Sequence, residues 1–349
     1  MLKLPGFVDL HVHFREPGFE YKEDIASGSL AAARGGFTDV CCMPNTNPTI
    51  DNPDVALYVL QRGKERELVN LMAVGALSIG LDGKELADFK AMKNSGICAL
   101  SDDGKTLENP QLMRQAAILA KELSLLITDH AEPEAEIVAR DINLAEETGC
   151  RIHLQHISMK KSVELIRRAK SRGLPITAET APHYFALTSA ALKTHMANAK
   201  MNPPLREEAD RLAIIEGIRD GTIDAIATDH APHSEEEKNQ PIDKAPFGII
   251  GLETAFAVSY TTLVKAGHID LNKLIELMSH NPADIIGLKR PSGHVYVDLD
   301  SSYIISRDNF VSKAKNTPFD GMEVYGKIIQ TVCNDKITWR DEIYDRPIN

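Results

Sequence analysis

Short apolar runs alternate with segments of helical periodicity from the start of the chain to about residue 290. The runs have the length of buried strands, and the segments between them repeat apolar positions every three or four residues, as amphipathic helices do. Each run is followed by one such segment. The expected strand and helix pairs are 7–13 with 22–34, 37–43 with 53–66, 69–77 with 84–94, 97–101 with 110–122, 125–130 with 134–147, 151–157 with 160–172, 176–180 with 206–219, and 223–228 with 252–266.

Eight strand-then-helix units predict a parallel α/β sheet closed into a (β/α)₈ TIM barrel. The alternative is an open, doubly wound sheet. That fold is favoured by a glycine-rich phosphate-binding turn after the first strand, which this sequence lacks. We therefore expect the closed barrel.

The pattern changes after residue 290, where extended segments with few helical periods follow. These segments are 294–298, 303–306, 324–332 and 337–339. They predict a small β-rich appendage. The expected domains are a barrel of residues 1–290 and a C-terminal appendage of residues 291–349 packed on it.

The charge balance argues against two classes of partner. The chain of 349 residues has 39 basic and 50 acidic residues, a net charge of -11, and no run of Lys or Arg. Binding to nucleic acid or to an anionic membrane surface is therefore not expected. An anionic small molecule can still bind where metals or an arginine reverse the local field.

The cysteines and the N-terminal residues bear on the compartment. The five cysteines are odd in number and form no CxxC pair, as expected of buried thiols in a reducing compartment. The chain opens without the apolar core of a signal peptide, and it has no run of 18 apolar residues. We expect a cytoplasmic protein.

Polar side chains end seven of the eight expected strands, where the active site of a TIM barrel lies. Taken singly, each has an ordinary explanation: a lone histidine is usually a core residue, and a lone aspartate such as Asp103 is usually a helix cap or turn residue. Together they form the imidazole and carboxylate set that zinc prefers. The six candidate ligands are His11, His13, Asp103, His130, His156 and Asp229.

Two other histidines need an interpretation. His153 and His156 differ in strand parity, so only one points into the barrel, and His156 lies at the expected end. We expect His153 to be structural. His183 either lines the pocket or packs in the core.

Such a site suits the hydrolysis of an amide or the reverse ring closure. Metal binding lowers the pKa of water from about 16 to roughly 7 and makes hydroxide available as a nucleophile. Asp229 fits the carboxylate that carries the proton, because strand eight adjoins strand one in a closed barrel. Arg15 has the reach to clamp a substrate carboxylate, although alone it would be read as a surface salt bridge. We find no motif for a Ser or Cys nucleophile.

Six motifs, at residues 11–18, 22–24, 43–46, 200–206, 228–233 and 245–248, resemble dihydroorotases of the cyclic amidohydrolase superfamily. The resemblance covers nearly the whole chain. It implies the cyclisation of N-carbamoyl-L-aspartate to L-dihydroorotate, the third step of pyrimidine synthesis, with zinc as cofactor, two ions per subunit or one. The implied roles are one zinc on His11, His13 and Asp229, a second on His130 and His156, Asp103 as the bridge, Asp229 as the proton shuttle, and Arg15, Asn45, Asn202, His233, Phe247 and Gly248 as substrate contacts.

The sequence departs from the family pattern at three points. Asp103 stands where many members have a carboxylated lysine, as in one bacterial-type branch. The segment between His130 and Gly149 is shorter than in common bacterial members. The chain reads as starting directly at the first barrel strand, without the N-terminal strands that complete a β-sandwich in relatives.

Two alternatives remain at this point. The first is another cyclic amidohydrolase, a dihydropyrimidinase, hydantoinase or allantoinase, whose substrates lack the α-carboxylate. The second is a non-catalytic barrel that acts as the partner of a carbamoyltransferase. The partner hypotheses are the small-molecule substrate, a homodimer, and association with aspartate carbamoyltransferase.

Overall fold

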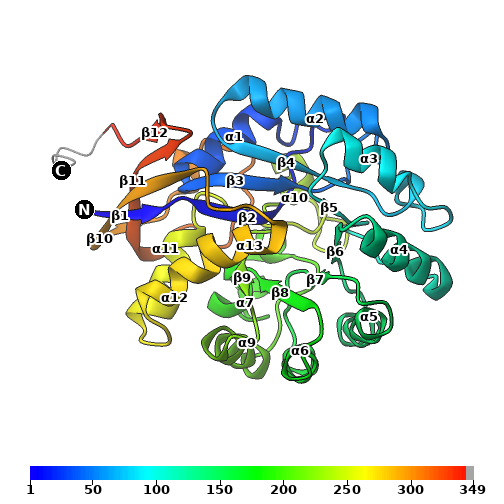
Figure 1. Cartoon of the computed structure of the whole chain (residues 1–349). Helices are drawn as coiled ribbons and strands as arrows, with labels where there is room; N and C mark the ends of the chain where they lie inside the picture. The colour runs from blue at the N-terminus through cyan, green and yellow to red at the C-terminus, as the bar shows by residue number, and fades with distance from the viewer. Residues whose placement is uncertain (343–349) are drawn as a thin grey trace.

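A parallel barrel forms the centre of the molecule. The structure, a computed structural model, describes residues 1–342. Within that range, eight strands pair in chain order as one parallel sheet, and helices surround it (Figure 1). The strands are β2 (Phe7–Val12), β3 (Phe37–Cys42), β4 (Asn70–Gly75), β5 (Ala99–Leu100), β6 (Leu126–Asp129), β7 (Ile152–Leu154), β8 (Ile176–Thr180) and β9 (Ala225–Ile226). The predicted (β/α)₈ TIM barrel is confirmed.

The barrel closes where the segment after β9 meets β2. Val12 forms a parallel bridge with His230, and the His13 amide donates to the His230 carbonyl at 2.9 Å. Deeper in the seam, Oδ1 of Asp9 accepts from the amides of His11 and Thr228, both at 3.1 Å. The closure therefore places the end of the eighth strand beside the two histidines of the first.

The helices begin where the sequence offers a cap. Asn52 caps α2 and Asn109 caps α4, each followed by a proline at the first helical position, and both helices have the expected bounds. Helix α3 begins later than expected, because Asp88 caps its first turn and the residues before Asp88 are not helical. The helices are α1 (Ile25–Arg34), α2 (Pro53–Arg66), α3 (Phe89–Ser95), α4 (Pro110–Glu122), α5 (Glu134–Thr148), α6 (Lys160–Ser171), α7 (Pro182–Ala186), α8 (Ala191–His195), α9 (Glu208–Asp220), α10 (Glu235–Lys238), α11 (Ala255–Ser259), α12 (Leu271–Ile275) and α13 (Asn281–Ile286), with π-helical turns at Tyr260–Lys265 and Glu276–His280.

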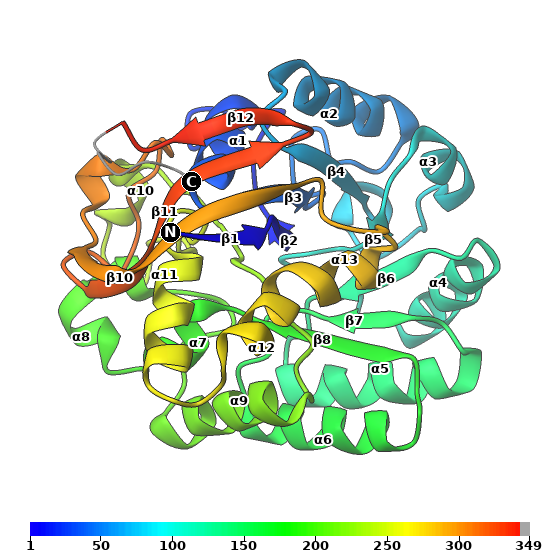
Figure 2. The same ribbon diagram turned by 60° about the vertical axis from the view of Figure 1, so that its left-hand side comes forward.

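A second sheet lies beside the barrel (Figure 2). It has four antiparallel strands in the order β1-β10-β11-β12 within the described residues. Their bounds are β1 (Leu2–Pro5), β10 (Gly293–Ile304), β11 (Glu323–Cys333) and β12 (Lys336–Arg340). The expected β-rich tail is therefore present.

One expectation about this sheet is wrong. The chain does not start at the first barrel strand, because Leu2–Pro5 pairs antiparallel with β10. The expected segment 294–298 and the first half of 303–306 both lie in β10, which ends at Ile304 and has an irregularity between Asp298 and Ser302. The domain division at residue 290 stays a prediction, to which the structure adds that β1 shares the sheet of the tail.

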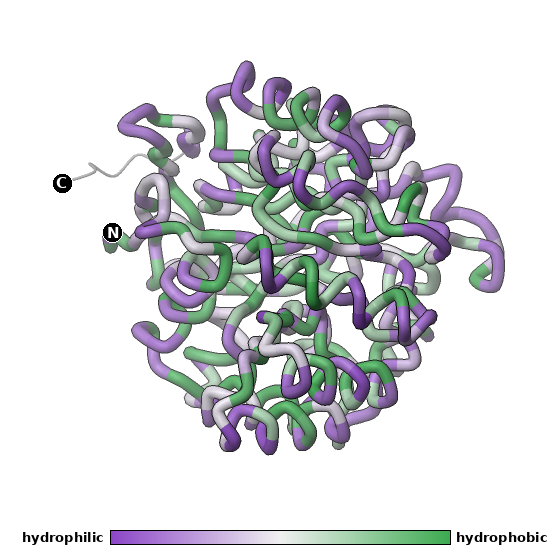
Figure 3. Tube along the Cα trace, turned by 45° about the vertical axis from the view of Figure 1, so that its right-hand side comes forward, coloured by the Kyte–Doolittle hydropathy of each residue, from purple (hydrophilic) through white to green (hydrophobic). Residues whose placement is uncertain are grey.

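Apolar side chains join the sheet to the barrel. Val295, Val297 and Ile328 belong to the same buried cluster as Phe7. The Phe7 ring stacks on Phe256 at a centroid distance of 4.9 Å. Figure 3 shows this distribution, with hydrophobic segments inside and hydrophilic ones at the periphery. None of the helices found between residues 1 and 342 is both long and apolar enough to cross a membrane.

One end of the barrel is filled by apolar side chains. Ala283 and Ile285 of α13 share a buried cluster with Val8 and Leu10 of β2. The candidate site residues lie at the other end of the barrel, where the carboxyl ends of the strands meet.

Candidate metal centre and substrate pocket

All six predicted ligands lie at the carboxyl ends of barrel strands, and each is at most 5% exposed. His11 is in β2, and the others follow the ends of their strands closely. Parallel strands bring these positions to one level of the barrel. The ligands by strand are His11 and His13 with β2, Asp103 with β5, His130 with β6, His156 with β7 and Asp229 with β9.

The first group of ligands consists of His11, His13 and Asp229. Oδ1 of Asp229 lies 3.2 Å from Nε2 of His13 and 3.5 Å from Nε2 of His11. One donor atom from each residue lies within 4.8 Å of the others, which is the spacing of a cation site. This is the set that the sequence predicted for one metal.

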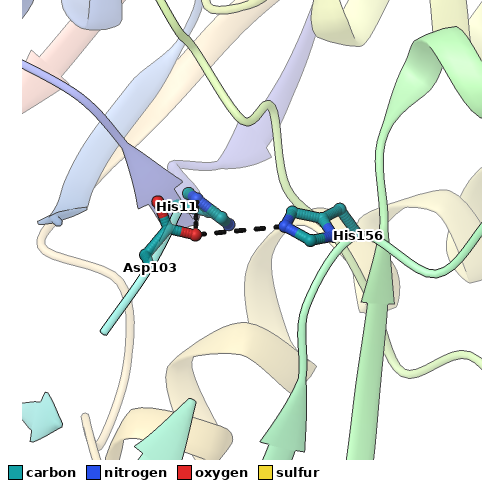
Figure 4. Close-up of side chains that lie close together, drawn as sticks. All are labelled: His11, Asp103 and His156. Carbon is teal, nitrogen blue, oxygen red and sulfur yellow. Dashed lines mark ion pairs between the residues drawn. The ribbon is translucent and has the colours of Figure 1, made fainter. Parts of the chain in front are cut away.

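The second group, His11, Asp103 and His156, meets the first at His11 (Figure 4). Oδ1 of Asp103 lies 3.1 Å from Nε2 of His11 and 3.9 Å from Nε2 of His156. The other carboxylate oxygen lies 3.4 Å from Nε2 of His13. Asp103 therefore faces both halves of the site, as a bridging carboxylate must.

His130 joins the second half less directly. Its Nδ1 lies 3.8 Å from Oδ1 of Asp103 and 2.9 Å from Nε2 of His156. Its Nε2 is 3.2 Å from the side-chain amide nitrogen of Asn202. The two imidazoles thus contact each other, and Nδ1 of His130 is the nitrogen that faces the carboxylate.

Burial and mutual charge set the protonation of the site. Burial lowers the pKa of His156 to about 3, so this imidazole is neutral near pH 7. Burial opposes ionisation of Asp229, but the charge of His11 and the hydrogen bond from His13, together with the other histidines, outweigh it and hold the pKa of Asp229 at about 2. His11 behaves oppositely: burial lowers its pKa, yet the charges of Asp103 and Asp229 raise it well above its usual value.

These observations fit a divalent cation. Nε2 of His11 and Oδ1 of Asp103 face each other without hydrogen-bond geometry, and neither has a hydrogen-bond partner among residues 1–342. A buried polar atom without a partner is unfavourable unless another group satisfies it. Neutral imidazoles and ionised carboxylates are the ligands that zinc takes. A cation would satisfy both atoms and replace the proton that the two carboxylates favour on His11.

Glu179 in β8 is a functional candidate that the sequence interpretation missed. Its Oε1 lies 3.1 Å from Nδ1 of His11, and its Oε2 lies 3.1 Å from Nε2 of His153. Burial raises the pKa of Glu179, but hydrogen bonds from the two histidines outweigh it and lower the pKa to about 2. His153 also bonds Oγ1 of Thr177 at 2.8 Å. Through Glu179 it is linked to His11, so the expectation that only His156 of the two points into the barrel does not hold, and a structural role for His153 stays a prediction. A carboxylate inside an expected barrel strand was the signal available in the sequence.

A pocket of about 300 Å³ opens over the ligands. It is lined by every predicted substrate contact, namely Arg15, Asn45, Asn202, His233, Phe247 and Gly248, and by every predicted ligand except His11. Asn45 is also held by the ligands, since its Oδ1 lies 2.9 Å from Nδ1 of His13 and its Nδ2 donates to Oδ2 of Asp103 at 3.3 Å. The amide therefore orients two of the predicted ligands and lines the pocket.

Two cationic side chains, Arg15 and Lys22, flank His233 at one wall of the pocket. Nη2 of Arg15 lies 3.5 Å from Nε2 of His233, and Nζ of Lys22 lies 3.4 Å from its Nδ1. Burial, followed by the charges of Arg15 and Lys22, lowers the pKa of His233 to about 3. Glu237 pairs with Lys22 at 2.8 Å, which leaves Arg15 as the cation that faces the pocket. A small anion is attracted to this wall. Lys22 was not among the predicted site residues.

His183 does not join this site. It is 1% exposed, its ring centroid lies 4.3 Å from that of Tyr184, and it is absent from the residues that line the pocket. The structure therefore supports the packing alternative for His183.

A TIM barrel with a histidine and aspartate cluster at the carboxyl ends of its strands defines a metal-dependent amidohydrolase. Solved structures agree in fold. An L-hydantoinase (dihydropyrimidinase) from Arthrobacter aurescens superposes with a TM-score of 0.89 at 24% identity, over 96% of this chain and 85% of that one. A dihydropyrimidinase from Brevibacillus agri superposes with a TM-score of 0.84 at 21% identity, over 98% and 86%.

Sequence relatives identify the family. The family model "Dihydro-orotase-like" matches residues 1–135. A dihydroorotase from Desulforapulum autotrophicum is 45% identical over 98% of this chain and 88% of its own length. A dihydroorotase from Caldicellulosiruptor saccharolyticus is 42% identical over 97% and 87%. The chain belongs to the dihydroorotase family, and it is an enzyme of the cyclic-amide hydrolase class.

Proposed function

We propose that the chain interconverts L-dihydroorotate and N-carbamoyl-L-aspartate, the third step of de novo pyrimidine synthesis. In hydrolysis, water adds a hydroxyl to the ring amide carbonyl, the carbon–nitrogen bond breaks, and the nitrogen gains a proton. The observation that carries the proposal is the position of Arg15 in the pocket wall beside His13 and Asp229. This position supports a carboxylate-binding site next to a site for amide cleavage.

The proposed cofactor is zinc, with two ions per subunit. His11, His13 and Asp229 would hold one ion, and His130 and His156 the other, with Asp103 between them. When bound, such ions make hydroxide available near pH 7 and polarise the amide carbonyl. The distances from Asp103 to the histidines of both halves support two ions rather than one.

Asp229 is the proposed proton carrier. Its pKa of about 2 leaves the carboxylate ionised at neutral pH, so it can accept a proton during hydrolysis. It lines the pocket, so it can then deliver that proton to the departing ring nitrogen. In the direction of ring closure, it accepts a proton from the attacking nitrogen.

The proposed substrate contacts divide between the two sides of the pocket. Arg15, Asn45 and His233 would hold the α-carboxylate, since neutral His233 can donate a hydrogen bond while Arg15 supplies charge and a two-pronged donor. Asn202 and the backbone at Phe247 and Gly248 would contact the rest of the ring. Substrates of hydantoinases and dihydropyrimidinases lack this carboxylate and have less use for these three residues.

A substrate comparison tests the proposal. Hydrolysis of dihydroorotate, dihydrouracil, hydantoin and allantoin would be followed by absorbance with the purified, zinc-loaded protein. We expect a clear preference for dihydroorotate. A preference for any of the other three would overturn the proposal. Absence of zinc from the purified protein, with no activity after zinc is added, would favour the non-catalytic barrel instead.

The partners of the chain are a separate proposal. Beyond the small-molecule substrate, we propose a homodimer and an association with aspartate carbamoyltransferase, which makes N-carbamoyl-L-aspartate. Light scattering of the protein alone and with the carbamoyltransferase would test both. A mass equal to one chain under both conditions would rule them out at the concentrations used.

A further inference from the structure

Asn316 lies outside the barrel strands, in the connection of residues 305–322 between β10 and β11, but its side chain reaches the loop that carries His233. Its Nδ2 donates to the carbonyls of Ala231 and Gly248, both at 3.0 Å, and its Oδ1 accepts from the His233 amide at 3.2 Å. We infer that Asn316 is a positioning residue that holds the substrate-binding loop of residues 231–250 against the barrel mouth.

The contacts of Asn316 span both ends of this loop. Its carbonyl accepts from the Ile250 amide at 3.0 Å, and the Ala231 amide donates to the Ile249 carbonyl at 2.9 Å. The two ends of the loop are thus hydrogen-bonded to each other, and Asn316 bonds backbone atoms at both ends. Pocket-lining residues project from this base on either side.

The hydrogen bonds at the base of the loop hold Gly248 against His233. Gly248 has a φ of 152°, and a Cβ at this position would lie 2.5 Å from the Ala231 carbonyl oxygen and 2.7 Å from Cδ2 of His233. Only glycine tolerates so close an approach. Small shifts of the Gly248 backbone would therefore move the His233 ring, which lines the pocket beside Arg15.

The chemistry of the side chain matches the task. A primary amide offers two donors and one acceptor from one planar group, and Asn316 uses all three on backbone atoms. The residue is 2% exposed, so water cannot readily replace it. An alanine would leave the Ala231 carbonyl and the His233 amide unsatisfied and would remove one of the two donors to the Gly248 carbonyl, and an aspartate would turn an oxygen toward both carbonyls.

Asn316 is itself held from the barrel side. Glu253, which lies between the loop and α11, accepts from the amides of Val311 and Ser312 at 3.1 Å. Nζ of Lys315 donates to the Phe310 carbonyl at 2.6 Å and closes the turn before Asn316. The anchor is therefore fixed independently of the loop that it holds.

A second holder of the same carbonyl lies within the loop. Nζ of Lys238 donates to the carbonyls of Pro246 at 3.0 Å and Gly248 at 2.9 Å. Lys238 moves with the loop, whereas Asn316 ties it to the rest of the protein. Loss of Asn316 should therefore let the loop shift as a unit without unfolding it.

This inference rests on the proposed function, because it treats His233 and Gly248 as substrate contacts. A displaced loop weakens substrate binding but leaves the metal ligands and Asp229 in place. We expect Asn316→Ala to raise the KM for dihydroorotate about tenfold or more, while kcat changes by less than about threefold. Zinc content should equal that of the wild type.

The matched control is Thr317→Val. Thr317 is also 2% exposed, and its Oγ1 accepts from the Phe319 amide at 3.2 Å, within the same connection. Both constants of this variant should stay within about threefold of the wild type. Asn316→Asp, which preserves the size of the side chain, should raise KM as Asn316→Ala does. It serves as the test if the alanine variant does not fold.

Hydrogen exchange of the zinc-loaded enzymes gives a readout that does not depend on the reaction. Amides of residues 231–250 should exchange faster in Asn316→Ala than in Thr317→Val. Unchanged exchange, an unchanged KM, or equal changes in the two variants would overturn the inference. A wild-type protein that does not hydrolyse dihydroorotate would instead overturn the proposed function, and the exchange comparison would still decide the role of Asn316.

Discussion

Glu179 and His11 form a buried pair, with Oε1 of the glutamate 3.1 Å from Nδ1 of the histidine. Both side chains are at most 1% exposed. Because a carboxylate accepts the proton of Nδ1, the pairing fixes the tautomer that turns Nε2 toward Asp103 and Asp229. Glu179 therefore determines which nitrogen of His11 is available as a ligand.

Glu179→Gln should weaken zinc binding by about 10- to 100-fold, because glutamine lacks the charge and has only one of the two acceptor oxygens that face His11 and His153. Competition with a chelating dye would measure the zinc dissociation constant directly. Asp39→Asn is a suitable control, since Asp39 is a buried carboxylate in β3 that bonds Ser292 and Asn70 instead. Equal zinc affinity of Glu179→Gln and the wild type would refute this role.

Asp229→Asn should lower kcat in both directions by about 100- to 10,000-fold, since the amide cannot carry the proton. The variant also loses one charged ligand, so zinc content must be measured in the same samples. Rates would be followed by absorbance from dihydroorotate and from N-carbamoyl-L-aspartate. A zinc-loaded variant that keeps most of its activity would exclude Asp229 as the proton carrier.

Arg15→Ala should raise the KM for dihydroorotate by about 10- to 100-fold, the loss expected for a charged hydrogen bond to a carboxylate. Arg15→Lys should fall between the alanine variant and the wild type, because lysine keeps the charge without the two-pronged geometry. Steady-state kinetics at fixed zinc would measure both. An unchanged KM in Arg15→Ala would show that the carboxylate binds elsewhere.

His183 should make stability depend on pH. Burial lowers its pKa from 6.5 to about 4, so unfolding takes up a proton between these values and stability falls as the pH is lowered through this window. At pH 5 this proton uptake lowers the free energy of unfolding by about 2 kcal/mol relative to neutral or higher pH. Urea unfolding at pH 7.5 and 5.0 should show a smaller loss for His183→Gln than for the wild type. Equal losses would contradict the assignment.

Removal of zinc should lower thermal stability. A ligand that binds only the folded state adds about 4 kcal/mol at a concentration 1,000 times its dissociation constant. Scanning calorimetry before and after chelation, and again after zinc is restored, would measure the effect. The melting temperature should fall on chelation and recover with zinc. A melting temperature that does not respond would show that the folded site holds no zinc.

The barrel was predictable because its signal is local and repeated. Helices such as Pro53–Arg66 and Pro110–Glu122 carry a proline and a capping asparagine in the sequence, and their predicted bounds are those observed. Strand β1 was missed because four residues carry too little periodicity, and its pairing with β10 depends on residues that are almost three hundred positions away.

The site was predictable for the residues that end strands and not for those that hold them. His11 and Asp229 stand in motifs that mark a metal site, whereas Glu179 looks like an ordinary polar residue of a strand. Asn316 has no periodic context, and its partners are backbone atoms of distant residues. Such contacts leave no pattern in the residues that they bond, so only the fold reveals them.

The pairing of Leu2 with Val297 also constrains how the protein is made. On the ribosome, the residues of β1 emerge before the barrel and wait for nearly all of it to be synthesised before their partner strand exists. Until then the edge of this strand is open to pairing with other chains. Chaperone dependence and aggregation of nascent chains should therefore concentrate on the N-terminal residues rather than on the catalytic loops.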